Sequence, residues 1–320
     1  MFSSLYLPLD AVNSAQGYRQ VAAQKQLQVF ISSHFVDTCR DDKVVRISAR
    51  HFIYLYDVLN CFDYFYDAVE PTQDEGKSVV DYSTPRYHKL IGFDLFPVLI
   101  PSLAEPYVTC SQYLDFACLQ EGDVVFDLGA YSGITAMAFA EKVGSSGKVI
   151  AVEPDPQNQI ALEKNLSQYK KLNRLSIDVV RSAIWKDCDG ISFSSEGNMG
   201  SSAVSIVGNQ RGAVVKSPSI TLDELARQFS LSHVSFIKCD VEGAEVHIFD
   251  SDFLQKFRPK IIVEPHPYNI GPERQAPSAS PAALCDAVAK HVSERLKRFG
   301  YRTEMIKQTG VNMPLLCAFP

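Results

Sequence analysis

From about residue 116 to the end of the chain, short apolar runs alternate with segments whose apolar residues recur at helical spacing. The runs are rich in β-branched residues and predict buried strands. They are Val124–Leu128, Lys148–Val152, Ile177–Val180, Val234–Cys239 and Lys260–Val263. Helices are expected between them at Ile134–Val143, from Pro156 to about Tyr169, from Leu222 to about Phe229 and from about Glu242. This alternation predicts a mainly parallel sheet with helices on both faces.

Local residue choices mark where several helices begin. Asp155 is expected to cap the helix that Pro156 opens, and Thr221 has a glutamate three residues later, which is the capping-box spacing. Ser280, followed by a proline, is expected to cap the last long helix. These signals fix the helix starts more firmly than the helix ends.

The chain closes with two strand-like runs, Tyr301–Ile306 and Leu315–Phe319, which are joined by a short turn at Gln308–Asn312 and are expected to be antiparallel. The predicted fold class is therefore α/β, a Rossmann-like doubly wound sheet that is mainly parallel and has an antiparallel terminal strand. A long Gly/Ser-rich stretch, Ser194–Val215, interrupts the alternation and is expected to be a lid-type loop or a surface excursion.

The first part of the chain lacks this regular pattern and is rich in aromatic residues. Val44–Ser48 predicts a strand, the partly alternating run Phe52–Tyr66 suits a half-buried strand, and Glu70–Lys77 is typical of a loop. Phe93–Pro101 contains two prolines and is expected to be an irregular packed segment. We therefore expect an N-terminal accessory or substrate-side region at 1–115 and the main domain at 116–320.

Composition narrows the class of protein. The 320 residues are 46% apolar, which excludes general disorder, and the formal net charge of −6 disfavours binding to nucleic acid through a positive field. There is no apolar run long enough for a membrane span and no signal-peptide pattern at the start. The eight cysteines have no zinc-type spacing, so we expect reduced thiols, no metal and a cytoplasmic protein.

A glycine-containing turn follows the first strand of the main domain. The segment from Asp127 to Gly133 reads DLGAYSG and lies between a predicted strand and a predicted helix, where ligands bind in doubly wound sheets. Gly129 lets the backbone turn and approach a ligand, and Gly133 lets the helix start against the strand. Glu153 ends the second strand, where a carboxylate can accept both ribose hydroxyls of a nucleoside.

Two classes of nucleoside compete for this turn. A dinucleotide site requires Gly-x-Gly-x-x-Gly, because the backbone must receive a pyrophosphate. Here Asp127 replaces the first glycine, and its carboxylate would repel a diphosphate but suits an adenosyl sulfonium cation. Together with Glu153-Pro154 at the end of the next strand, the pattern indicates a binding site for S-adenosylmethionine. A NAD-linked oxidoreductase is the weaker alternative.

Further acidic residues follow the later strands. Asp240 and Glu242 come directly after the fourth main strand, and His266 follows the fifth. The carboxyl ends of parallel strands open onto one crevice, so we expect these side chains to meet there. Glu264 lies at the same edge, and the side chains of Asp240, Glu264 and His266 are of the types that bind metals. We nevertheless favour a metal-free acidic pocket.

Four segments of the chain, between about residues 120 and 265, resemble the FkbM-type family of methyltransferases in their order and spacing. They are VVFDLGAYSGITA, KVIAVEPDP, SITLDELA and FIKCDVEGAEVHIF. The resemblance implies a class I methyltransferase fold and S-adenosylmethionine-dependent methyl transfer, usually to a hydroxyl of a sugar, polyketide or other natural product.

The resemblance also implies roles for individual residues. The residues expected around the methionine part are Asp127, Gly129, Ala130, Tyr131, Ser132 and Gly133. Glu153 would hold the ribose, Pro154, Ser182 and Ala183 would border the adenine, and Asp240 would face the sulfonium side.

The acceptor is expected to be a small molecule, and its hydroxyl proton requires a base. From its position at the end of a strand, His266 is the first candidate for this base, and Asp240 and Glu242 rank after it. Two alternatives stay open at this point. One is N-methylation, which requires less help from a base, and the other is a non-catalytic module that binds a nucleoside or a partner.

Overall fold

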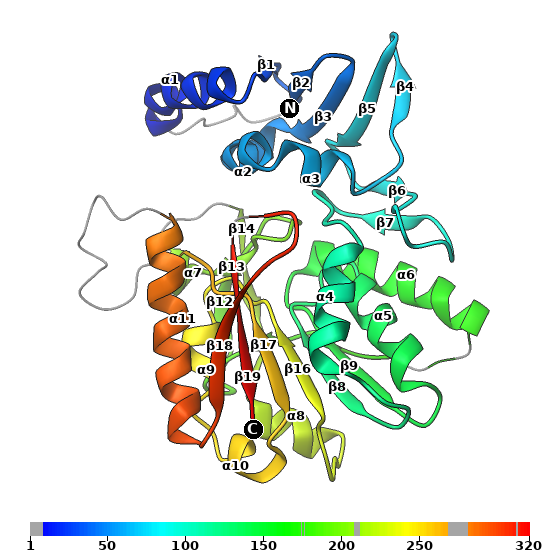
Figure 1. Cartoon of the computed structure of the whole chain (residues 1–320), viewed down its shortest axis with the longest axis vertical. Coiled ribbons are helices and arrows are strands. Elements are labelled where there is room, and N and C mark those ends of the chain that lie inside the picture. The colour runs from blue at the N-terminus through cyan, green and yellow to red at the C-terminus, as the bar shows by residue number, and fades with distance from the viewer. Residues whose placement is uncertain (1–8, 174, 176, 208–211, 268–280, 312) are drawn as a thin grey trace. The chain divides into compact units, whose positions relative to one another are not determined.

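A computed structural model of the chain describes residues 9–173, 175, 177–207, 212–267, 281–311 and 313–320. The chain forms two compact units, which divide between Tyr107 and Val108. Each unit has a sheet of its own (Figure 1).

The second unit is built on a seven-stranded sheet in the order β10-β9-β8-β16-β17-β19-β18. Its parallel strands are β8 (Val124–Leu128), β9 (Lys148–Val152), β10 (Ile177–Val180), β16 (Phe236–Cys239) and β17 (Lys260–Val263). The last two, β18 (Arg302–Lys307) and β19 (Pro314–Phe319), pair with each other antiparallel, and β19 is antiparallel to β17. The predicted fold class and the antiparallel closing pair are confirmed.

Helices cover both faces of this sheet because its central strands are apolar on both sides. Figure 1 shows α4 (Val108–Ala117), α5 (Ile134–Val143) and α6 (Pro156–Asn173) on one side. On the other side lie α9 (Glu245–Ile248) and α11 (Pro281–Arg298). Two short helices complete the unit, α8 (Leu222–Gln228) and α10 (Phe253–Phe257). Buried residues of α11, including Val288, Val292 and Leu296, join the sheet residues in one core.

Most predicted helix starts are confirmed. Asp155 accepts hydrogen bonds from the backbone N–H groups of Gln157 and Asn158 at the start of α6, and the Thr221 hydroxyl accepts one from Glu224 N. The helix expected from about Glu242 begins instead at Glu245, because the preceding residues form a turn in which Glu242 has φ +52°. The proposed cap at Ser280 lies outside the described residues.

The Gly/Ser-rich stretch is more ordered than expected. It forms a three-stranded antiparallel sheet from β12 (Ile191–Ser195), β13 (Ser202–Ala203) and β14 (Ala213–Ser217), with a short helix α7 (Val204–Val207). The stretch expected to be a lid-type loop or a surface excursion thus contains regular elements and is not a loop throughout. A further two-stranded parallel pair joins β11 (Ala183–Ile184) to β15 (Ser219–Ile220).

The first unit contains a five-stranded sheet in the order β1-β2-β3-β5-β4. Its strands are β1 (Gln28–Ile31), β2 (Phe35–Arg40), β3 (Lys43–Ser48), β4 (Thr72–Asp74) and β5 (Lys77–Tyr82). The helix α1 (Leu9–Gln24) precedes the sheet, and a two-stranded ladder of β6 (Arg86–His88) and β7 (Val98–Ile100) follows it. The strand expected at Val44–Ser48 is confirmed.

Two expectations for this unit are wrong. The aromatic run at 52–66 is helical and forms η1 (Ala49–Tyr54), α2 (Leu55–Asn60) and α3 (Phe62–Tyr66). Its buried residues Leu55, Val58, Leu59 and Phe62 recur at helical spacing, so the alternation of the aromatic residues alone was misleading. The segment 70–77 is a hairpin and not only a loop, because Gly76, with φ +79°, allows a tight turn between β4 and β5.

The order of strands in the large sheet reverses between β8 and β16, where doubly wound folds bind ligands. Here the turn after β8 passes very close to the end of β16. A Cβ atom on Gly129, which has φ +77°, would lie 1.7 Å from the Asp240 carbonyl oxygen. No other residue fits this position without separating the two strand ends.

The substitution Gly129→Ala should therefore destabilise the second unit by about 3 kcal/mol or more, because the methyl group overlaps rigid backbone. Gly122→Ala is the matched control in the same unit. Gly122 also has a positive φ, +91°, but a Cβ atom there would lie 3.7 Å from its nearest neighbour, the Ser146 hydroxyl. Gly122→Ala should therefore cost only the strain of the backbone conformation, about 1 kcal/mol. Denaturant titration measures both, and equal losses would contradict this account of the contact.

Candidate active site

Glu153 ties the turn after β8 to the turn after β9. Its carboxylate is buried and accepts hydrogen bonds from Tyr131 N at 2.9 Å and Asp155 N at 2.8 Å. Burial raises the pKa of Glu153 to about 8, although these two donors act in the opposite direction. The predicted ribose-binding carboxylate thus lies beside the predicted methionine-binding turn, where it supports the backbone of Tyr131.

Asp127 is completely buried and belongs to an ionic group inside the sheet. It accepts a hydrogen bond from the Thr135 hydroxyl at 2.6 Å and lies 3.6 Å from the ammonium of Lys238, its register partner on β16. Lys238 also donates to the Gly129 carbonyl at 2.7 Å and pairs with Asp240 at 3.1 Å. Burial raises the pKa of Asp127, while Lys238 lowers it. Lys238 therefore links the glycine turn to the end of β16.

His266 lies at the centre of three carboxylates. Its Nε2 is 3.4 Å from Asp240 and 3.2 Å from Glu242, and its Nδ1 is 3.1 Å from the fully buried Glu245. Glu245 also accepts hydrogen bonds from His266 N and Gly243 N. The expected meeting of Asp240, Glu242 and His266 is thus realised, and Glu245 does more than stabilise a helix start.

This environment decides the charge of the imidazole. Burial alone would lower the pKa of His266, but the carboxylates of Glu242 and Glu245 raise it well above its ordinary value of 6.5. The side chain is then an imidazolium at neutral pH and holds its proton among carboxylates.

The same group has ligand atoms that could hold a metal. One atom each from Asp240, Glu242 and His266 lies within 4.8 Å of the others. Glu264, which sequence reasoning considered for this purpose, is instead hydrogen-bonded by the Tyr113 hydroxyl at 3.2 Å and the Gln308 amide at 3.4 Å. A cation would have to displace the proton of His266, because only a neutral imidazole binds metals.

The remaining predicted cofactor residues lie around this crevice. In the glycine turn, Ala130, Ser132 and Gly133 are buried, and the Ser132 carbonyl accepts a hydrogen bond from Asn165 of α6. Pro154 and Ser182 are partly exposed after β9 and β10. Ala183 is buried and tied to β15, since its N–H donates to the Pro218 carbonyl.

Sequence reasoning assigned Asp155 only a capping role. Its carboxylate also accepts hydrogen bonds from the Ser195 and Ser201 hydroxyls and from the backbone N–H groups of Glu196 and Gly197. Asp155 therefore holds the β12–β13 turn against the start of α6, next to Glu153. Asn165 and Lys238 were missed, because their partners are distant in sequence, and Glu245 was interpreted only as a residue that stabilises a helix start.

The fold is a Rossmann-like doubly wound domain with acidic side chains gathered at the ends of β16 and β17. The family profile "Methyltransferase FkbM domain" matches residues 127–303. The chain belongs to the FkbM methyltransferase family, and its methyl donor is S-adenosylmethionine.

Three solved structures illustrate the wider similarity. Precorrin-6y C5,15-methyltransferase from Geobacter metallireducens is 16% identical over 66% of this chain and 86% of its own, with a TM-score of 0.37. Fibrillarin from Aeropyrum pernix, in complex with natively bound S-adenosyl-L-methionine, is 11% identical, and the match covers 91% of this chain and 99% of fibrillarin, with a TM-score of 0.39. The O-methyltransferase from Bacillus cereus in complex with SAH is 13% identical, and the match covers 68% of this chain and 81% of that protein, with a TM-score of 0.36. The family assignment rests on the profile and not on these weak similarities.

No curated protein matches the sequence. In the part of the chain that the structure describes, no helix is both long and apolar enough to cross a membrane.

The substitution Glu245→Gln should lower the pKa of His266, because it removes one of the carboxylates that stabilise the imidazolium. A raised folded-state pKa stabilises the folded protein at low pH, and that contribution is lost as pH rises through the folded pKa. In the variant this loss should begin at lower pH. Histidine-selective NMR titration measures the shift, with His88 of the other unit as the internal control. An unchanged His266 pKa would contradict the assigned contact.

Proposed function

We propose that the protein transfers a methyl group from S-adenosylmethionine to a hydroxyl oxygen of a small molecule, such as a sugar, a polyketide or another natural product. The observation that supports this best is the group of Asp240, Glu242 and His266 at the ends of β16 and β17. Oxygen nucleophiles require removal of a proton as the bond forms, and this group offers carboxylates beside the donor-binding turn.

The charges of the crevice suit a cationic donor. Asp127, Asp240, Glu242 and Glu245 carry up to four negative charges, against the positive charges of Lys238 and protonated His266. The donor carries a positive charge on sulfur, and the product is neutral there. An acidic crevice therefore favours the donor over the product, which helps product release.

Within this proposal the turn residues Gly129 to Gly133 hold the methionine part, Glu153 holds the ribose, and Pro154, Ser182 and Ala183 border the adenine.

The raised pKa of His266 changes the ranking of bases. An imidazolium cannot accept the acceptor's proton, so we assign this step to Glu242 or Asp240. Both carboxylates are partly exposed, and both contact His266 Nε2. His266 then orients the accepting carboxylate, and Glu245 orients His266.

S-adenosylmethionine supplies an electrophilic methyl group. The acceptor oxygen forms a bond to the methyl carbon as the carbon–sulfur bond breaks, and the sulfur keeps the electron pair. The hydroxyl proton passes to the carboxylate of Glu242 or Asp240. We expect no metal in this scheme, since a carboxylate beside the donor can take the proton without one. N-methylation is the second candidate and would depend less on these carboxylates.

The remaining properties agree with a cytoplasmic enzyme that acts on small molecules. All eight cysteines are free thiols, and Cys118 and Cys188 are exposed. The net charge of −6 gives no general attraction to nucleic acid.

Calorimetric titration with S-adenosylmethionine should give saturable binding that Glu153→Ala weakens by about tenfold or more, because the substitution removes the proposed ribose acceptor and the support of Tyr131. Glu163→Ala on the outer face of α6 is the matched control, since it removes a half-exposed carboxylate that pairs with Arg181. Equal binding by the wild type and Glu153→Ala, or no binding by the folded wild type, would contradict the proposal.

With donor and hydroxyl acceptor both at saturation, Glu242→Gln or Asp240→Asn should lower kcat about 10²- to 10⁴-fold, and each should also weaken donor binding because it removes one of the charges that attract the sulfonium. His266→Gln should lower kcat less, because it only orients the base. Single-turnover kinetics and product mass measure these effects. Retention of full turnover by both carboxylate variants would exclude them as the base, and methylation of amine acceptors alone would favour the second candidate.

A further inference from the structure

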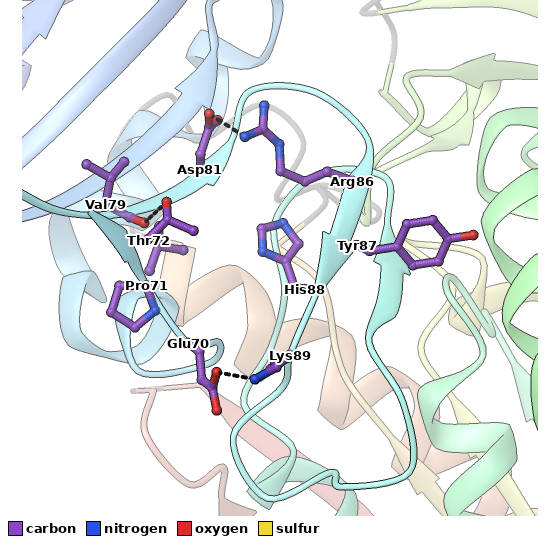
Figure 2. A pocket seen from close by; sticks show the side chains of 10 residues that line it. Glu70, Pro71, Thr72, Val79, Asp81, Arg86, Tyr87, His88 and Lys89 are labelled. Carbon is purple, nitrogen blue, oxygen red and sulfur yellow. Dashed lines mark hydrogen bonds and ion pairs between the residues drawn. The ribbon is translucent and has the colours of Figure 1, made fainter. Parts of the chain in front are cut away.

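The N-terminal unit has a pocket of its own, which the methyltransferase scheme does not use. Its volume is about 240 Å³. Three segments line it, 70–72 at the start of β4, 79–81 on β5 and 86–89 on and after β6. In Figure 2 the His88 imidazole lies on the side of β6 that faces Pro71, Thr72 and Val79, whereas Tyr87 points to the other side. All three segments belong to one compact unit.

The charged side chains of this pocket occur as opposite pairs. Arg86 contacts Asp81 at 2.7 Å, and Lys89 contacts Glu70 at 3.2 Å. Both pairs are drawn as dashed lines in Figure 2. With the neutral imidazole of His88 described below, the lining has no net charge, but it places a cationic donor directly beside an anionic acceptor at two positions. Pro71 and Val79 add an apolar surface.

His88 packs on the Tyr82 ring, with the ring centroids 5.2 Å apart, but this contact leaves one of its polar atoms unexplained. The residue is 8% exposed, and its Nε2 is buried without a hydrogen-bond partner among the described residues. Arg86 Nε is likewise buried without one. Burial, with a smaller effect of Arg86, lowers the pKa of His88 to about 4, so the imidazole is neutral and has one donor and one acceptor nitrogen. Buried polar atoms without partners are rare in native proteins and frequently mark a binding site.

We propose that this pocket binds a small neutral polyhydroxyl compound of about the size of one monosaccharide ring. Two adjacent hydroxyls match a carboxylate next to a guanidinium or ammonium, since one hydroxyl donates to Asp81 or Glu70 and the other accepts from Arg86 or Lys89. His88 makes a further hydrogen bond with its free nitrogen. The carbon-bound hydrogens of such a ring pack on Pro71 and Val79.

The balance of charge argues against ionic ligands. An anion would have to displace Asp81 or Glu70 from its cation, and a cation would have to displace Arg86 or Lys89. A neutral hydroxyl shares the existing pairs and leaves both intact. Sulfate and glycine serve as the anionic and zwitterionic comparison probes.

The test is a calorimetric titration of the full-length protein with D-glucose, D-galactose, D-mannose and myo-inositol, with histidine-selective NMR of the wild type to locate the site. At least one probe should bind and shift the wild-type His88 signals saturably, and His88→Leu should reduce its calorimetric affinity about tenfold or more. The melting temperature of His88→Leu should change little, because a buried side chain still packs on Tyr82 and no hydrogen bond to Nε2 is lost. His34→Leu, at an exposed position of the same unit, is the matched control and should leave binding unchanged.

Three results would overturn the proposal: no saturable shift with any of the four compounds, binding of sulfate or glycine in their place, or unchanged affinity of His88→Leu. The outcome is independent of the methyl-transfer proposal. Glu153→Ala should retain probe binding at His88 even if it loses the methyl donor.

Discussion

The ammonium of Lys238 holds the two halves of the crevice together. It lies between Asp127 on β8 and Asp240 after β16, and it donates to the Gly129 carbonyl in the turn that the family motif defines. Both Lys238 and Asp127 are almost completely buried, so each charge is tolerated only because it has polar partners, of which the other is one. Loss of one partner of such a pair typically costs about 3–5 kcal/mol. The position of the glycine turn and that of Asp240 are therefore coupled through one side chain.

This coupling explains why the site is acidic without being unstable. Repulsion among Asp127, Asp240, Glu242 and Glu245 is offset by two cations, Lys238 at one end and His266 at the other. Asp240 contacts both cations, so it joins the donor-binding turn to the place where the acceptor's proton must go. A base chosen by residue type alone favours histidine. In the proposed scheme the surrounding carboxylates reverse that choice, because they keep the histidine charged.

The sequence predicted the second unit well because its strands are buried on both faces and appear as continuous apolar runs. α5 and four of the five parallel strands have the expected limits, whereas β16 begins two residues later than predicted. The run at 52–66 failed because Leu55, Val58 and Leu59, which carry the helical period, were left out when only aromatic residues were considered. The site residues were found because parallel strands end at one edge, so Asp240, Glu242 and His266 could be expected together. Lys238 could have been found by the rule that a lysine inside a buried strand has a carboxylate beside it.

Partners that are distant in sequence were the part that pattern reasoning could not supply. Nothing local indicates that Glu245 reaches His266, or that Asp155 receives donors from the β12–β13 turn. In both cases a carboxylate on a helix start accepts backbone N–H groups from another segment and so fixes where a functional side chain lies. The buried polar groups of this unit thus act less as ligand contacts than as the framework that places them. In the other unit, the buried Nε2 of His88 has no hydrogen-bond partner among the described residues, and His88 lines a pocket. A ligand in that pocket would give a buried polar atom the partner that the fold does not supply.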